Sequence, residues 1–321
     1  MIGVGVQTWG TDVAALRRYW SRADELGYAR ITYGDGLWPW THDGWTMLGA
    51  LAAGTRAARI GPAVTYAFDP AAHHPSWLAK RAVTVDHLCG GRLDVRLAVG
   101  AEDATTAAWW ASHGIEYPRA GARIAVLEET VALLRRLWTG EAVDHDGPRY
   151  RLAGARLAPA PVQRPGPPLW IAAMGERATD MVARCADGWE ASFLSPPAFA
   201  AAWQRVRGQL ARHGRGADSL RRSIELDVVI TPSRAGVDTA VRAFCAARGI
   251  APDHPLVAGA LIGDAETIAE RIAMYAEAGA TDLMLGFADF PDTAMLERFA
   301  GMGGLDVLPG PPAIRWRTPP P

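Results

Sequence analysis

The chain has almost no lysine and almost no net charge. Lys80 is the only lysine among 321 residues, so arginine carries nearly all of the positive charge. We interpret this chiefly as codon bias, with bidentate anion recognition as a secondary interpretation. Lys and Arg together number 33 and Asp and Glu 34, for a formal net charge of −1. Such a balance gives no attraction to nucleic acid or to an anionic membrane, so neither partner is predicted.

Paired cysteines and long apolar runs are missing as well. The three cysteines, Cys89, Cys185 and Cys245, are odd in number and far apart, as expected of free thiols in a reduced compartment. The opening MIGVGVQTWG is uncharged and typical of a strand rather than of a signal peptide. No apolar run reaches the roughly 18 residues of a membrane span. We therefore expect a cytoplasmic protein.

A metal-ligand pattern is also absent. No His/Cys pair has ligand spacing, and the adjacent His73 and His74 cannot easily direct both rings at one ion, so no metal is predicted. The composition, 49% hydrophobic and 21% charged, is that of an ordinary globular protein with a sizeable core. The length fits either two domains or one α/β barrel.

Short apolar runs alternate with longer amphipathic ones along the chain, which predicts a repeated β-α order. The connections are long enough for parallel pairing, so the leading architecture is a single (β/α)8 TIM barrel over residues 1–307. A doubly wound sheet is weaker because no G-x-G-x-x-G follows the first strand. Strands are expected at 2–9, 29–34, 58–66, 92–100, 167–175, 188–194, 223–231 and 280–288.

Two segments interrupt this alternation. Residues 101–120 form a polar insertion with tryptophans after the fourth strand, and residues 141–167 predict a short hairpin with a proline-rich return before the fifth. Long loops of this kind usually border a site. The proline-rich residues 308–321 are expected to be an extended tail.

In a barrel of this kind the functional site lies where the strands end. The segment Ala172–Arg177 passes from a strand into a helix through small residues, which would expose backbone N–H groups to an anion such as a phosphate. An ordinary tight turn explains this segment equally well. The other strand ends carry Gln7 to Trp9, Asp35 and Gly36, Val64 to Tyr66, Gly100 to Glu102, and Glu190.

Four segments together resemble the bacterial luciferase-like superfamily of flavin and deazaflavin (F420) oxidoreductases. They read HHPSWLAKRAVTVDHLCGGRLDVRLAVG, LEETVALLRRLWTGEAV, APAPVQRPGPPLWIAAMGERATDMVARCADGW and LIGDAETIAERIAMYAEAGATDLML. The likeness runs in order from about residue 3 to residue 300. It implies a flavin-binding barrel with a small-molecule substrate, and a homodimer is compatible with it.

The resemblance assigns candidate roles around the cofactor ring. Asp35 matches the acid that ends the family's second strand, and Ala63-Val64 in GPAVTY match a bulge with a cis peptide that presses on the ring. The segment Ala173 to Arg177 matches the family's phosphate site, which strengthens the anion interpretation. The implied cofactor-binding residues are Asp35, Ala63, Val64, Gly100, Ala101, Ala173, Met174, Gly175 and Arg177.

One departure from the family pattern concerns the catalytic histidine, because Gly36 stands where the imidazole would follow Asp35. We expect the vacated volume to leave room for a larger ligand among the tryptophans. The candidate catalytic residues are then Asp35, Trp40 and Glu102, with helix capping, packing and solvated loop as the respective structural alternatives. Candidate substrate-binding residues are Trp9, Trp38, Trp40, His42, His74 and Trp109, each of which could equally serve packing or the surface.

Two cofactors follow from the resemblance. The prediction is an F420-dependent oxidoreductase that transfers a hydride to or from a bulky, mostly apolar molecule of bacterial secondary metabolism. The alternatives are an FMNH2- and O2-dependent monooxygenase, and a barrel that has lost catalysis and binds a ligand.

Overall fold

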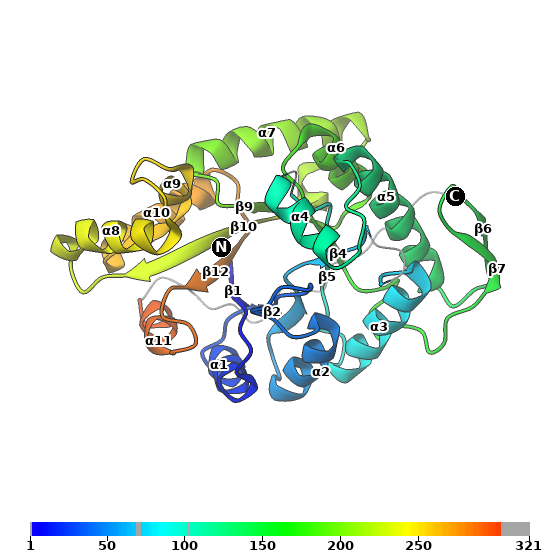
Figure 1. Ribbon diagram of the computed structural model, residues 1–321, viewed down its shortest axis with the longest axis horizontal. Helices are drawn as coiled ribbons and strands as arrows, with labels where there is room; N and C mark the ends of the chain where they lie inside the picture. The colour runs from blue at the N-terminus through cyan, green and yellow to red at the C-terminus, as the bar shows by residue number, and fades with distance from the viewer. Residues whose placement is uncertain (1, 69–71, 102, 303–321) are drawn as a thin grey trace.

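The computed structural model describes residues 2–68, 72–101 and 103–302, and these form a parallel barrel surrounded by helices (Figure 1). Neighbouring strands follow the order β3-β2-β1-β12-β10-β9-β8-β5-β4. The barrel strands are β1 (Gly3–Thr8), β2 (Arg30–Tyr33), β3 (Arg59–Pro62), β4 (Thr65–Tyr66), β5 (Val95–Ala98), β8 (Leu169–Ala172), β9 (Gly188–Ser192), β10 (Arg221–Ile230) and β12 (Asp282–Phe287). The predicted TIM barrel is confirmed, although the domain limit at residue 307 and the tail lie outside the described residues.

The third strand of the barrel is divided into β3 and β4 by a cis peptide between Ala63 and Val64, as predicted. β3 pairs with β2, whereas β4 pairs with β5. An isolated bridge between Ile60 and Leu93 adds a contact on the same side. The break therefore turns the chain at the point where the barrel closes.

Helices cover the outside of the barrel (Figure 1), and some of them begin at a capping aspartate. Asp12 accepts a hydrogen bond from Ala15 N, and Asp264 accepts one from Thr267 N, so each satisfies a free N–H group of a first turn. The main helices are α1 (Val13–Glu25), α2 (Gly44–Gly54), α3 (Pro75–Leu88), α5 (Ala120–Leu137), α6 (Glu176–Cys185), α7 (Pro196–Arg212), α8 (Val237–Arg248) and α10 (Ala265–Glu277). Within the described ranges, no helix is both long and apolar enough to cross a bilayer.

Smaller elements fill the predicted interruptions. The insertion after β5 contains helix α4 (Ala104–Ser112), and the antiparallel hairpin before β8 consists of β6 (Val143–Asp146) and β7 (Arg151–Ala155). The hairpin was predicted, whereas the helix was not. Further unpredicted elements are the 3-10 turns η1 (Ala217–Ser219) and η2 (Arg234–Gly236), helices α9 (Pro255–Gly259) and α11 (Ala294–Ala300), and strand β11 (Leu261–Gly263), which pairs with β10.

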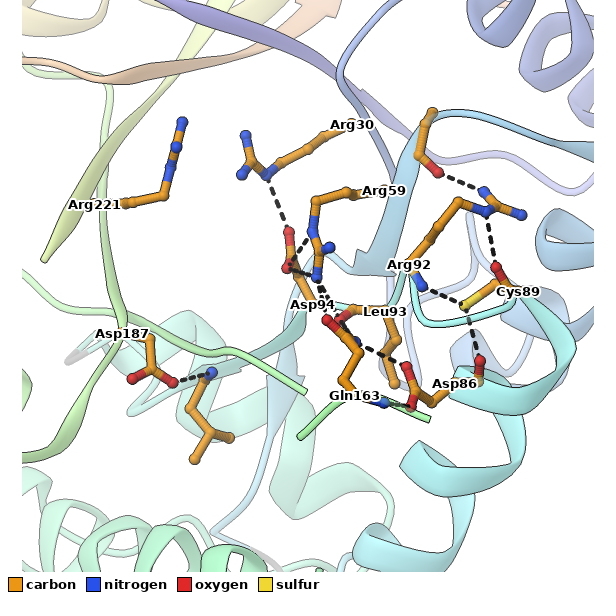
Figure 2. Close-up of polar contacts among 12 residues, drawn as sticks. Arg30, Arg59, Asp86, Cys89, Arg92, Leu93, Asp94, Gln163, Asp187 and Arg221 are labelled. Carbon is orange, nitrogen blue, oxygen red and sulfur yellow. Dashed lines mark hydrogen bonds and ion pairs between the residues drawn. The ribbon is translucent and has the colours of Figure 1, made fainter. Parts of the chain in front are cut away.

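A buried ion network closes the base of the barrel, where the strands begin. Arg30 Nε lies 3.0 Å from Asp94 Oδ2, and an Arg59 guanidinium nitrogen lies 2.6 Å from Asp94 Oδ1 (Figure 2). Asp282 pairs with Arg30 and with Arg221. The functional site of such a barrel lies at the opposite end, where the strands end. We therefore expect this ion network to contribute to stability and not to function.

A second ionic layer lies between this base and the other end of the barrel. Arg96 of β5 pairs with Glu190 of β9, and its guanidinium lies 4.8 Å from the ring centroid of Trp170. Burial lowers the pKa of Arg96 to about 10, which still leaves it protonated at neutral pH. Arg96, Glu190 and Trp170 thus fill the interior of the barrel at this level.

Candidate functional site

The ending edges of the strands surround a cavity of about 1000 Å³. Its position agrees with the general location of active sites in (β/α)8 barrels. Its walls include twelve of the predicted site residues: Trp9, Asp35, Trp38, Trp40, Ala63, Val64, Gly100, Ala101, Ala173, Met174, Gly175 and Arg177. The structure therefore brings all nine of the predicted cofactor-binding residues to one place.

Asp35 is a buried acid on the wall of this cavity, with 6% of its surface exposed. One carboxylate oxygen accepts a hydrogen bond from Gly44 N (3.2 Å), and the other accepts one from the Thr65 hydroxyl (2.5 Å). Burial raises the pKa of Asp35, and the charge of nearby His73 and the Thr65 hydrogen bond oppose this effect. The acid holds the start of α2, as its structural alternative expects, and it also lines the cavity, where its catalytic role stays a prediction.

The backbone at Gly36 has a φ of +153°, which side chains rarely adopt. A Cβ atom at this position would lie 3.0 Å from both Cδ1 and Nε1 of Trp38. The expectation of vacated volume at Gly36 is therefore wrong, because the Trp38 indole fills the space beside the missing side chain. A side chain at position 36 would require the Trp38 indole to move by a few tenths of an ångström.

Three tryptophans form a stack at the cavity mouth. The Trp38 ring lies 5.3 Å from Trp40 at an interplanar angle of 9°, and 5.3 Å from Trp109 at 18°. Trp38 and Trp40 line the cavity, whereas Trp109, on helix α4, packs behind Trp38 and supports it. Trp40 remains 52% exposed, as expected of a ring that a ligand can still cover.

Gly100 lets the chain turn closely past an aromatic side chain. Its φ is +90°, and a Cβ there would lie 2.3 Å from the Tyr117 hydroxyl oxygen. That hydroxyl donates to the Ala101 carbonyl at 2.6 Å. The turn at Gly100-Ala101 is thereby held against the segment that precedes α5, and both of its residues line the cavity together with Ala63 and Val64.

The N-terminus of α6 opens directly into the cavity. Gly175 is its N-cap, no side chain caps the first turn, and a Cβ on Gly175 would meet no atom within 4 Å. Arg119 and Arg177 line the same side of the cavity. Free N–H groups, the positive end of the helix dipole and two guanidinium groups together form a site suited to an anion.

Besides Trp109, two predicted substrate-binding residues do not line the cavity. The His42 ring lies 3.0 Å from the Thr11 carbonyl oxygen, and His74 caps α3 by accepting from Ser76 N at 3.2 Å. Neither imidazole lines the cavity, so the structure gives each a local structural contact instead. Glu102 lies outside the described residues.

The floor of the cavity contains residues to which the sequence assigned no role. Gln7, Glu190, Ser192 and Glu225 all line it. Burial raises the pKa of Glu225 to about 7, opposed by hydrogen bonds from Ser192 and Gln7. The signal was available, because strand alternation in SIELDVVI places Glu225 on the same face as Ser223 and Asp227. Tyr66, Phe193, Arg119 and Arg123 are further lining residues without an assigned role.

No cluster of three or more potential metal ligands occurs among residues 2–68, 72–101 and 103–302. The aromatic walls and the anion site at α6 are therefore the main chemical features of the cavity. A large planar ligand with an attached phosphate matches both features.

Comparisons with known proteins find curated relatives that are similar to this chain in sequence. The chain is 31% identical to an F420-dependent glucose-6-phosphate dehydrogenase of Nocardia farcinica over 226 residues, 68% of this chain and 63% of the relative. It is 32% identical over 202 residues, 61% of this chain and 50% of the relative, to a phthiodiolone/phenolphthiodiolone dimycocerosates ketoreductase of a Mycobacterium species. These and two further curated relatives are matched over 49% to 68% of their own length.

A solved structure shares the fold at low sequence identity. The F420-dependent tetrahydromethanopterin reductase of Methanopyrus kandleri superposes with a TM-score of 0.77 at 16% identity, covering 94% of this chain and 96% of that one. The model of the luciferase-like monooxygenase family matches residues 2–282. The chain therefore belongs to the luciferase-like monooxygenase family.

Proposed function

We propose that this protein is an F420-dependent oxidoreductase that transfers a hydride to or from a carbon atom of a small molecule. The observation that carries the proposal is the single cavity in which an anion site at α6 faces the Ala63-Val64 turn and Asp35. Two relatives with F420 in their names are 31% and 33% identical to the chain. The cofactor supplies the hydride chemistry, and the protein supplies binding, orientation and exclusion of water.

The cavity fits a deazaflavin with a phosphate-bearing side chain. The N–H groups after Gly175, together with Arg177, would hold the phosphate, and the backbone at Ala63-Val64 and Gly100-Ala101 would contact the ring. The open space in front of Gly175 is the space a phosphate needs, because no atom lies within 4 Å of a Cβ built there. Asp35 would lie beside the ring as a buried acid.

We propose that the substrate is bulky and mostly apolar. The remaining walls are the aromatic side chains of Trp9, Trp38, Trp40 and Tyr66. The arginines that line the cavity, Arg119, Arg123 and Arg177, come from α5, the loop before it and α6, which is the proposed cofactor side. Arg123 is also occupied, because it donates to the carbonyl oxygens of Val99 and Ala101.

The only lysine of the chain does not lie at the aromatic walls, so it cannot bind a phosphate group of the substrate there. Lys80, on α3, donates to the Ala158 carbonyl and is not among the described residues that line the cavity. A phosphate on the substrate would therefore lack a described partner beside the indoles. The glucose 6-phosphate in the names of three relatives is accordingly not the substrate that we propose here.

A second function is an FMNH2- and O2-dependent monooxygenase, and the description of the matching family supports it. A planar flavin with a phosphate would fit the same walls, so shape does not separate the two cofactors. A ligand-binding barrel without catalysis is the third alternative, because Gly36 replaces the family's histidine.

An equilibrium titration with each cofactor tests the proposal. We expect F420 to quench tryptophan fluorescence with a dissociation constant in the micromolar range, since Trp38 and Trp40 line its site. FMN is expected to bind at least tenfold more weakly. Tighter binding of FMN would select the monooxygenase, and binding of neither cofactor would select the ligand-binding barrel.

A further inference from the structure

The proposed reaction also needs a group that gives a proton to the substrate oxygen or takes one from it. The inference about this group rests on the proposed function. When a hydride moves between a cofactor and an alcohol or ketone, a proton must also leave or reach the substrate oxygen. An efficient donor or acceptor faces the substrate and titrates near the working pH. Gly36 cannot serve, because it has no side chain.

Several cavity residues are already engaged. Both carboxylate oxygens of Asp35 accept hydrogen bonds, from Gly44 N and from the Thr65 hydroxyl. Glu190 is 3% exposed and pairs with Arg96. Burial raises the pKa of the Tyr66 hydroxyl to about 12, so it would be a slow proton acceptor at neutral pH.

Glu225 differs from these groups in position and in contacts. It lies in the middle of β10 and lines the cavity floor, where its side chain is partly accessible. The Ser192 hydroxyl and the Gln7 amide hydrogen-bond to its carboxyl group and fix its direction. Among the ion pairs of the described residues, none includes Glu225, although the chain supplies a cation to Glu190 nearby.

The charged surroundings of Glu225 keep its two protonation states close in energy. Burial raises its pKa to about 7, and the charge of Asp227 acts in the same direction, while Arg96 on β5 and the two hydrogen bonds oppose them. Tyr66 on β4 and Asp35 beside β2 are the other titratable groups facing this side. On β12, the residue opposite Glu225 is the uncharged Met284.

We propose that Glu225 exchanges the proton with the substrate oxygen, in place of the imidazole that Gly36 lacks. In the reducing direction, the carbonyl carbon gains a C–H bond from the hydride that the reduced cofactor supplies. The carbonyl oxygen gains an O–H bond with the proton of Glu225 as the C=O π bond breaks. The carboxylate then takes a proton from solvent, which balances the proton released when the cofactor is oxidised. In the oxidising direction, the carboxylate of Glu225 accepts the hydroxyl proton.

The first test requires no cofactor. Infrared difference spectra of the wild-type protein, recorded between pH 5 and pH 9, are expected to show one protonated carboxyl group that titrates near pH 7. This signal is expected to be absent in Glu225→Gln and present in Asp227→Asn, where it moves to lower pH because the charge of Asp227 no longer raises the pKa of Glu225. Asp227 is a matched control, because it lies two residues away on β10 but pairs with Arg248 at 2.9 Å and does not line the cavity. A signal that persists in Glu225→Gln would overturn the proposal.

The second test measures the change in absorbance at 420 nm with a panel of aryl alcohols and ketones. Ketone reduction by the wild type is expected to decline as the pH rises through 7, and alcohol oxidation to increase, because each needs the opposite form of Glu225. In Glu225→Gln the turnover falls by about 10²–10⁴-fold and loses this pH dependence, whereas the F420 dissociation constant stays within about twofold. Glu225→Asp should recover part of the turnover.

The outcomes separate this inference from the proposed function. Glu225→Gln that turns over within about twofold of the wild type across the pH range would refute the role of Glu225 and leave the F420 oxidoreductase in place. A wild-type protein that binds no F420 and changes no absorbance with any alcohol or ketone would refute both.

Discussion

Replacing Gly175 with valine tests whether the cofactor phosphate lies at the start of α6. The new Cβ would point into open space, so the folded chain can accept it, but its methyl groups would occupy the anion site. An anion at a helix N-terminus gains about 0.3–2 kcal/mol from the dipole. Hydrogen bonds to a charged group contribute about 1.5–3 kcal/mol each. Loss of one such bond alone corresponds to a more than tenfold weaker F420 affinity.

The control for this variant is Gly216→Val. Gly216 is the N-cap of η1 with φ −75° and ψ 154°, nearly the same backbone as Gly175 at −74° and 154°. A Cβ on Gly216 also meets no atom within 4 Å, and the residue does not line the cavity. We expect fluorescence titration to show weaker F420 binding only in Gly175→Val, with similar melting temperatures for both variants. Equal affinity in the two variants would place the phosphate elsewhere.

Three further predictions concern the acid, the glycine beside it and the ion network. Asp35→Asn should lower the F420-linked turnover at least tenfold with a stable fold, because it removes the buried acid beside the proposed ring position, and unchanged turnover would contradict this role. Gly36→His should weaken ligand binding in a calorimetric titration, because its Cβ would displace Trp38 from 3.0 Å, and improved binding would contradict the account. Asp94→Asn should lower the free energy of unfolding at pH 7 by about 3–5 kcal/mol in urea melts, because it removes the carboxylate that pairs with Arg59 and one of the two carboxylates that pair with the buried Arg30. Burial would raise the pKa of Asp94, but Arg59 and Arg30 outweigh it and lower the pKa from 3.8 to about 2, so this stabilisation is complete above about pH 4 and is lost as the pH falls towards 2. A variant as stable as the wild type at pH 7 would show that the network contributes nothing.

The strands and main helices could be predicted because each has a strong local signal. All eight predicted barrel strands are present, since apolar runs between amphipathic segments leave few alternatives for residues such as those of β9 and β12. The short elements α9 and β11 were missed because five and three residues carry too little periodicity to distinguish them from loops. For residues 101–120 the sequence predicted a polar insertion and not helix α4, because the tryptophans of this segment were interpreted as pocket residues.

The parts of the site that depend on local backbone geometry could be predicted, because residue types such as glycine and alanine indicate that geometry. Small residues before α6 indicated a helix N-terminus open to an anion, and the structure places Gly175 there without a capping side chain. The stacking of Trp38 between Trp40 and Trp109 could not be predicted, because it depends on the position of α4 over the mouth. The burial that changes the pKa of Glu225 is likewise a property of the closed barrel and not of the local sequence.

The most direct test of the proposed function is an anaerobic turnover measurement with the purified protein, F420H2 and a panel of bulky aryl ketones. We predict that absorbance at 420 nm rises without oxygen as the ketone is reduced, in a ratio of one cofactor oxidised to one alcohol formed. Turnover that appears only with FMNH2 and oxygen, and that inserts an oxygen atom into the substrate, would contradict the assignment of this barrel as an F420-dependent oxidoreductase.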